Sequence, residues 1–246
     1  MKKTALIWAA IILAAGLASA QKPKSQKEVE AINAAIQAQD PAAKIKAVDE
    51  ALQKFADTEF KSMLLTMQVG AAADLNDPTK VIVYGENALK VDPKNYQVQF
   101  WMAQATVQGV GQFDLDKEER LTRAEKLAND GIKNLATAAK PNPQLTEAQW
   151  ADGKKQLEAQ GHEALGLVAN LRKKYDVAIK EYETAVALAP EVTTQVRLAG
   201  AYNNGGRPAD ALKLADQVLA QPNLHPAVKQ VATAEKEKAA KATAGK

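Results

Sequence analysis

The side chains that could do chemistry are few, and the first to consider are the two histidines, His162 and His225. Zinc sites combine histidine with cysteine or carboxylates at short spacing, and a catalytic histidine needs a partner within hydrogen-bond reach. The chain has no cysteine, and no carboxylate motif with metal spacing lies near either histidine. We therefore expect no metal and no cofactor, with His162 replacing an interhelical packing aromatic and His225 preceding a proline at a turn.

Three acidic residues at alternate positions, Asp114, Asp116 and Glu118, resemble the start of a calcium-binding loop. Such a loop needs a glycine for its sharp turn and ends in a bidentate glutamate. Here Glu119 stands where the glycine is needed, which argues against such a loop. Asp116 and Glu119 are better explained as a helix N-cap and the glutamate that bonds back to it.

Motifs for phosphate binding and nucleophilic catalysis are also incomplete. Gly109-x-Gly111 is not followed by the lysine and hydroxyl residue that a phosphate-binding loop requires. Ser25 and Ser62 lie in no context that would place a nucleophilic serine on a strained turn. The residue inventory therefore predicts that the protein is not an enzyme. The alternative is that it is an enzyme whose site matches no familiar motif.

The N-terminus has the three parts of a secretory signal peptide. Lys2 and Lys3 are followed by an apolar run over residues 5–17 and by the small residues 18–20. The run is shorter than the ~20 residues of a membrane-spanning helix. We expect cleavage after Ala20, a periplasmic or secreted bacterial protein, and no integral membrane segment in the mature chain. The alternative is that residues 1–20 are retained as an anchor.

The charge balance argues against nucleic acid as a partner. The formal net charge is +3, and loss of the two signal-peptide lysines brings it closer to zero, so no strong field attracts a polyanion. Lysines do gather at the C-terminus, at Lys236, Lys238, Lys241 and Lys246. They indicate either a solvated helix end or a weak contact with an anionic envelope polymer or membrane surface.

The elements that must position any site are helices, because no stretch alternates apolar and polar residues as a half-buried strand would. Asp-Pro pairs, which suit the start of a helix, recur along the chain. Pro41 is followed by Ala51 at the same distance that separates Pro78 from Ala88, and the spacing recurs from Tyr175, which replaces proline. Repeated spacing of this kind predicts stacked helical hairpins.

The sequence thus predicts an all-α solenoid of antiparallel helix hairpins. Residues 21–25 are a short linker, and the repeat domain spans 26–240. We place five hairpins at 26–55, 59–91, 96–139, 145–190 and 193–222, then a capping helix at 225–240 and a flexible tail at 241–246.

The fourth hairpin resembles the tetratricopeptide repeat. The residues that carry the resemblance are Leu165, Gly166, Tyr175, Ala178, Tyr182, Ala185 and Pro190. His162 and Ala169 depart from the pattern, standing where tryptophan and tyrosine are usual. The fifth hairpin repeats the pattern less completely, with Leu198, Ala199 and Tyr202.

The resemblance implies a right-handed superhelix whose first helices line a concave groove that binds a protein or peptide. If Leu165, Gly166 and Ala169 pack inside the fourth hairpin, the adjoining stripe faces the groove. The predicted groove residues are Glu163, Leu167, Asn170, Val196, Arg197, Gly200, Asn203, Phe100 and Trp101, although core packing also suits the last two. The expected function is a non-catalytic envelope scaffold, and the alternative is a structural tether that uses the lysine-rich C-terminal helix.

Overall fold

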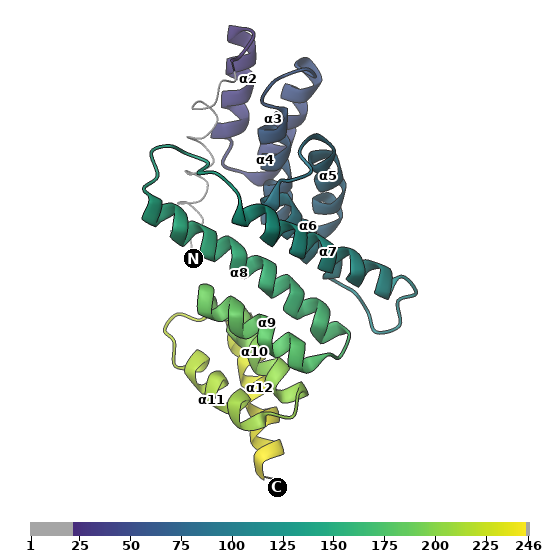
Figure 1. Ribbon diagram of the computed structural model, residues 1–246, viewed down its shortest axis with the longest axis vertical. Helices are drawn as coiled ribbons and strands as arrows, with labels where there is room; N and C mark the ends of the chain where they lie inside the picture. The colour runs from purple at the N-terminus through teal and green to yellow at the C-terminus, as the bar shows by residue number, and fades with distance from the viewer. Residues whose placement is uncertain (1–21, 245–246) are drawn as a thin grey trace. The chain divides into compact units, whose positions relative to one another are not determined.

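The computed structural model describes residues 22–244, and every regular element in this range is a helix (Figure 1). The expected all-α class and the hairpin pattern are therefore confirmed. The described residues do not include the predicted signal peptide at 1–20, the predicted cleavage site after Ala20, or Lys246. Among the described helices, none combines the length and apolar character needed to cross a bilayer.

The helices pair along the chain as the repeated spacing predicts. The first three pairs are α2 (Gln26–Gln37) with α3 (Pro41–Lys54), α4 (Lys61–Asp74) with α5 (Pro78–Val91), and α6 (Tyr96–Val107) with α7 (Lys117–Ala136). They are followed by α8 (Glu147–Leu171) with α9 (Tyr175–Leu188), α10 (Val192–Asn204) with α11 (Pro208–Leu219), and the final helix α12 (Pro226–Ala244).

Side-chain caps explain where several helices begin. The Asp40 carboxylate accepts a hydrogen bond from the Ala43 amide at 2.8 Å, and Pro41 opens α3. Asp77 caps α5 in the same way, 3.0 Å from the Lys80 amide. A carboxylate at this position satisfies an amide that has no partner within the helix, and proline has no amide to leave unpaired.

The described residues fall into two compact units, and α7 and α8 each contribute to both. The first unit contains residues up to Gln108 together with Asn129–Lys154. Its core includes Phe100, which is fully buried, and a Cβ on Gly131 would lie 2.5 Å from that ring. A residue without a side chain at this point therefore lets a large aromatic fill the space between helices.

The first unit also contains a buried carboxylate at the start of α2. Glu28 is 1% exposed, and its Oε2 accepts from the Lys24 amide at 2.5 Å. The Ser25 hydroxyl in turn caps the Glu28 amide at 3.2 Å. The nearby Thr58 hydroxyl and then the hydrogen bond from the Lys24 amide lower the pKa of Glu28, because both stabilise the charged form.

The second unit contains Gly109–Ala128 and the residues from Lys155 onward. Tyr182 lies at its centre with Ala169, Ala178 and Leu198. A Cβ on Gly166 would lie 2.6 Å from the Tyr182 ring, so glycine is what allows α8 and α9 to approach. Burial raises the pKa of the Tyr182 hydroxyl well above its usual range.

The last helix is longer than predicted. α12 runs to Ala244, so residues 241–244, which we expected in a flexible tail, are helical. Alanine is the strongest helix former, and no glycine or proline interrupts this stretch. The Thr243 hydroxyl bonds to the Ala239 carbonyl at 3.1 Å and so adapts to the helix.

Candidate functional site

The second unit contains the part of α8 on which the groove was predicted, and Ala169 of this helix packs in the core where the repeat register places it. Gly166 contacts Tyr182, and Ala169 is 5% exposed within the same core. The stripe of α8 beside this core carries Glu163, Leu167 and Asn170, as the spacing predicts. Leu167 is partly buried against the core, so its side chain is shared between packing and the surface.

Glu163 and Arg197 join the first helices of two consecutive hairpins. A guanidinium nitrogen of Arg197 on α10 contacts the Glu163 carboxylate on α8. The side chain of Glu163 is 14% exposed and that of Arg197 is 43% exposed, and burial lowers the pKa of Arg197. Loss of Arg197 would leave a largely buried carboxylate without its partner, which is strongly unfavourable. This pair therefore has a structural role whether or not it contacts a ligand.

Asn170 is the polar residue of the stripe that packing leaves incompletely bonded. Its side-chain carbonyl oxygen is buried and has no hydrogen-bond partner within the described residues. A buried acceptor without a donor costs about 1–3 kcal/mol. The residue as a whole is half-buried, so a bound chain can supply the missing donor only where the side chain turns toward the surface.

Three residues expected in the groove on α10 are covered by α12. Val196 is 7% exposed and packs with Val218 and Ala232, which corrects its assignment to an open surface. The Asn203 amide donates to the backbone carbonyl and the carboxylate of Glu235, at 2.9 and 2.8 Å.

Gly200 faces the same helix, since a Cβ there would lie 3.4 Å from the Glu235 carboxylate. We predicted the capping helix, but we did not foresee that it would cover this part of the groove. It does so because α12 packs against both α10 and α11.

Phe100 and Trp101 follow the core-packing alternative and not the groove assignment. Phe100 belongs to the core of the first unit and is not exposed at all. Trp101 is half-buried, and its ring lies 3.0 Å from where a Cβ on Gly70 would stand. Both aromatics are therefore explained by helix packing.

Two of the groups that suggested chemistry in the sequence, His162 and Asp114, contact other residues of the chain. His162 Nδ1 lies 2.7 Å from the Glu181 carboxylate, and its other ring nitrogen is 3.9 Å from Glu158. Asp114 accepts from the Gly111 amide at 2.8 Å and pairs with Arg120 at 3.6 Å. Within residues 22–244, no group of three metal-ligating side chains is arranged to hold an ion.

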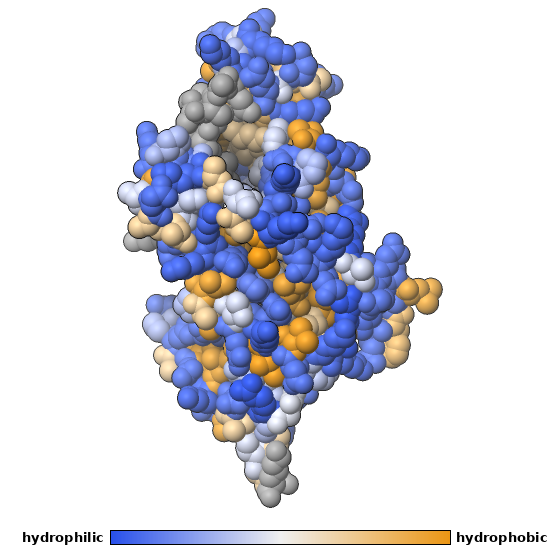
Figure 2. All heavy atoms as spheres, viewed as in Figure 1, coloured by the Kyte–Doolittle hydropathy of each residue, from blue (hydrophilic) through white to orange (hydrophobic). Residues whose placement is uncertain are grey.

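Two features of the second unit were not found from the sequence. Arg172 bonds to Glu118 at 2.6 Å and to Glu125 at 2.7 Å, contacts that join segments far apart in the chain. The loop before α7 exposes Phe113 and Leu115, which are 88% and 106% exposed, and hydrophobic atoms protrude from the hydrophilic surface there (Figure 2). Their sequence signal is only an apolar residue on each side of Asp114.

Comparison with solved structures agrees with this arrangement. The fold is that of tetratricopeptide-repeat proteins. The protein TTC0263 of Thermus thermophilus is 17% identical, with a TM-score of 0.57 over 85% of this chain and 98% of that one. MamA from Desulfovibrio magneticus is 14% identical, with a TM-score of 0.56 over 80% of this chain and 96% of that one.

A third similar structure is an assembly chaperone of RpL4, 13% identical, with a TM-score of 0.50 over 87% of this chain and 97% of that one. At these identities the likeness concerns the fold. No family model matches the sequence, and a search of curated proteins finds no relative.

Proposed function

We propose that this protein is a non-catalytic scaffold of the cell envelope that binds a partner polypeptide along the first helices of its hairpins. The observation that carries the proposal is Asn170, which has a buried, unpaired acceptor on the predicted stripe of α8. Backbone amides of an extended segment are the donors that such an acceptor lacks. The proposed contact surface therefore consists of Glu163, Leu167, Asn170 and Arg197, and excludes the part of α10 covered by α12.

An envelope location is part of the proposal and depends on the N-terminal sequence. Residues 1–20 have the charged, apolar and small-residue parts of a signal peptide. N-terminal sequencing of the exported protein should begin at Gln21. A protein that begins at Met1 and stays in the membrane fraction would contradict both the cleavage and the location.

The binding role is tested by capturing partners from the envelope fraction and titrating the captured protein against Asn170→Ala. This variant removes an unsatisfied acceptor without removing an ion-pair partner, so its free energy of unfolding should be unchanged or higher by up to about 1–3 kcal/mol. Affinity should fall several-fold, as expected for a contact that orders a bound chain. Asn87→Ala is the matched control, because Asn87 is exposed on α5. Equal affinities for all three proteins would remove the site from α8.

The tether through the C-terminal lysines has less support. Lys236 pairs with Asp216 at 2.7 Å, and Lys238 donates to Asn204 at 2.7 Å. Both cations are thus held within the second unit. If the protein were a tether, Lys241→Gln would abolish surface association and leave polypeptide capture unchanged.

A further inference from the structure

The turn between α8 and α9 contains a lysine in a backbone conformation that lysine rarely adopts. In three hairpins the turn between the two helices has a middle residue with positive φ: Asn76 at 52°, Lys173 at 60° and Gly206 at 75°. Asparagine and glycine tolerate this region, whereas a lysine there is strained. The closing hydrogen bond is the same in each turn, for example from the Lys174 amide to the Ala169 carbonyl at 2.9 Å. Of these three turns, only the one between α8 and α9 has a cation at the middle position in place of a residue that suits the backbone conformation.

The two lysines of this turn are also unpaired. Within the described residues, neither Lys173 nor Lys174 has an acidic group within the 4.0 Å that defines an ion pair. In the next hairpin, Arg207 occupies the position of Lys174 and pairs with Asp210 three residues later, at 2.7 Å. The residue three positions after Lys174 is Val177, which is 48% exposed and carries no charge.

One carboxylate that lines the smaller pocket beside the turn is already engaged. Glu118 bonds to Arg172 at 2.6 Å. The Arg172 guanidinium, and more weakly the charge of Lys174, lower the pKa of Glu118. Glu118 therefore does not neutralise the lysines by direct contact.

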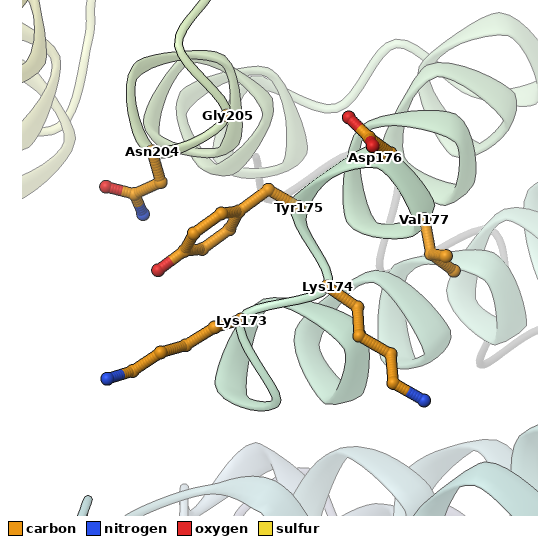
Figure 3. A pocket seen from close by; sticks show the side chains of 7 residues that line it. All are labelled: Lys173, Lys174, Tyr175, Asp176, Val177, Asn204 and Gly205. Carbon is orange, nitrogen blue, oxygen red and sulfur yellow. The ribbon is translucent and has the colours of Figure 1, made fainter.

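Two shallow pockets meet at this turn and share its lysines. The larger, of about 470 Å³, is lined by Lys173, Lys174, Tyr175, Asp176, Val177, Asn204 and Gly205 (Figure 3). The smaller, of about 370 Å³, is lined by Lys117, Glu118, Leu171, Arg172, Lys173 and Lys174. A chain lying along the turn could thus place a side chain in each pocket.

Donors converge in the larger pocket. The side chains of Lys173 and Tyr175 extend in the same direction as the Asn204 amide, whereas Lys174 points away from them and the Asp176 carboxylate lies apart (Figure 3). The Asn204 oxygen accepts from Lys238 at 2.7 Å, which leaves the amide nitrogen as a donor. The Tyr175 hydroxyl has no hydrogen-bond partner in the described part of the chain.

We propose that the Lys173–Lys174 turn is a docking site for an acidic polypeptide segment. Lys173, Tyr175 and Asn204 receive one carboxylate, and Lys174 attracts a second from the other side of the turn. The exposed Val177 offers an apolar contact beside the cations, which favours a polypeptide over an inorganic anion. The turn directly follows the stripe of α8 that contains Asn170, because the Lys173 amide donates to the Asn170 carbonyl at 3.0 Å. The two sites are distinguished by their probes, which are poly-L-glutamate for the turn and the captured partner for Asn170.

The most informative variant is Lys173→Asn, because its effects on stability and on binding have opposite signs. Asparagine suits positive φ, so the melting temperature should rise by about 2–4 °C. Binding of a short poly-L-glutamate peptide should weaken, because the charge is lost. Lys173→Asn combined with Lys174→Gln should weaken it at least ~tenfold.

Lys213→Gln is the matched control, since it removes one exposed charge from α11 in the same unit. The purified protein is titrated with poly-L-glutamate, inorganic phosphate and phosphatidylglycerol vesicles. Selective loss of poly-L-glutamate binding in the turn variants, with Lys213→Gln unchanged, supports the site. Equal loss in Lys213→Gln, unchanged affinity in the turn variants, or tighter binding of the vesicles or of phosphate than of the peptide would overturn it. None of these outcomes depends on the Asn170 titration.

Discussion

Two glycines of the second unit should respond in opposite ways to the same substitution. Gly166 lies on α8 and Gly200 on α10, and both are inside helices. A Cβ on Gly166 would lie 2.6 Å from two ring carbons of Tyr182, whereas the atom nearest to a Cβ on Gly200 would be an oxygen of the Glu235 carboxylate, at 3.4 Å. The pair therefore separates the effect of helix propensity from that of close packing.

Alanine in place of glycine inside a helix gains about 1 kcal/mol at either position. At Gly166 the new methyl group would stand well inside the ~3.5–4.0 Å at which carbon atoms attract. Tyr182 is 1% exposed, so its ring cannot move into solvent. Overpacking of a dense core costs roughly 1–3 kcal/mol, so Gly166→Ala should be neutral to about 2 kcal/mol less stable. Gly200→Ala should be up to about 1 kcal/mol more stable.

Urea and thermal unfolding followed by circular dichroism measure both changes. The difference between the variants should be about 1–3 kcal/mol, with Gly200→Ala the more stable. Shortening Tyr182 to leucine should remove the clash, so that Gly166→Ala then stabilises the protein relative to Tyr182→Leu alone. If Gly166→Ala stabilises the unmodified protein as much as Gly200→Ala does, Tyr182 does not pack on Gly166 and the register is wrong.

Three further measurements address other parts of the fold. Because the pKa of Glu28 is lowered, its charge stabilises the protein above the ordinary carboxyl pKa of 4.5, and this contribution is lost as the pH falls through the lowered value. Glu28→Gln should therefore make the free energy of unfolding depend less on pH in acid, and an unchanged pH profile would contradict the account. Asp40→Ala should cost about 1 kcal/mol in urea unfolding, and a neutral result would mean that the cap is unimportant. Burial and the hydrogen bond to Glu183 raise the pKa of Tyr202 to about 12, so Glu183→Gln should shift that tyrosine's alkaline titration to lower pH, and no shift would exclude the bond.

The hairpins could be predicted from the sequence because their start signals are local. Asp40 and Asp77 cap their helices through amides only three residues away. Thr146 and Gln149 likewise exchange hydrogen bonds at the start of α8, at 2.9 and 3.1 Å. Interactions over so few residues leave a clear pattern, and the Gly166 packing was accessible through its place in the repeat.

The groove was predicted less well because its surface depends on contacts between distant residues. The Asn203 side-chain amide donates a hydrogen bond to Glu235, which lies 32 residues later in the chain. Arg172 is fixed by glutamates on α7. The positive φ of Lys173 has no signal in the sequence, because the matching turns carry Asn76 and Gly206, which suit that conformation, and lysine does not.

The most direct test of the central claim is hydrogen exchange of the protein with and without a polypeptide captured from the envelope fraction. If the partner lies along the first helices, amides of α8 around Asn170 should exchange more slowly in the complex, and Asn170→Ala should reduce that protection. Unchanged exchange throughout α8, or protection confined to the lysine-rich end of α12, would contradict a partner-binding scaffold of this kind.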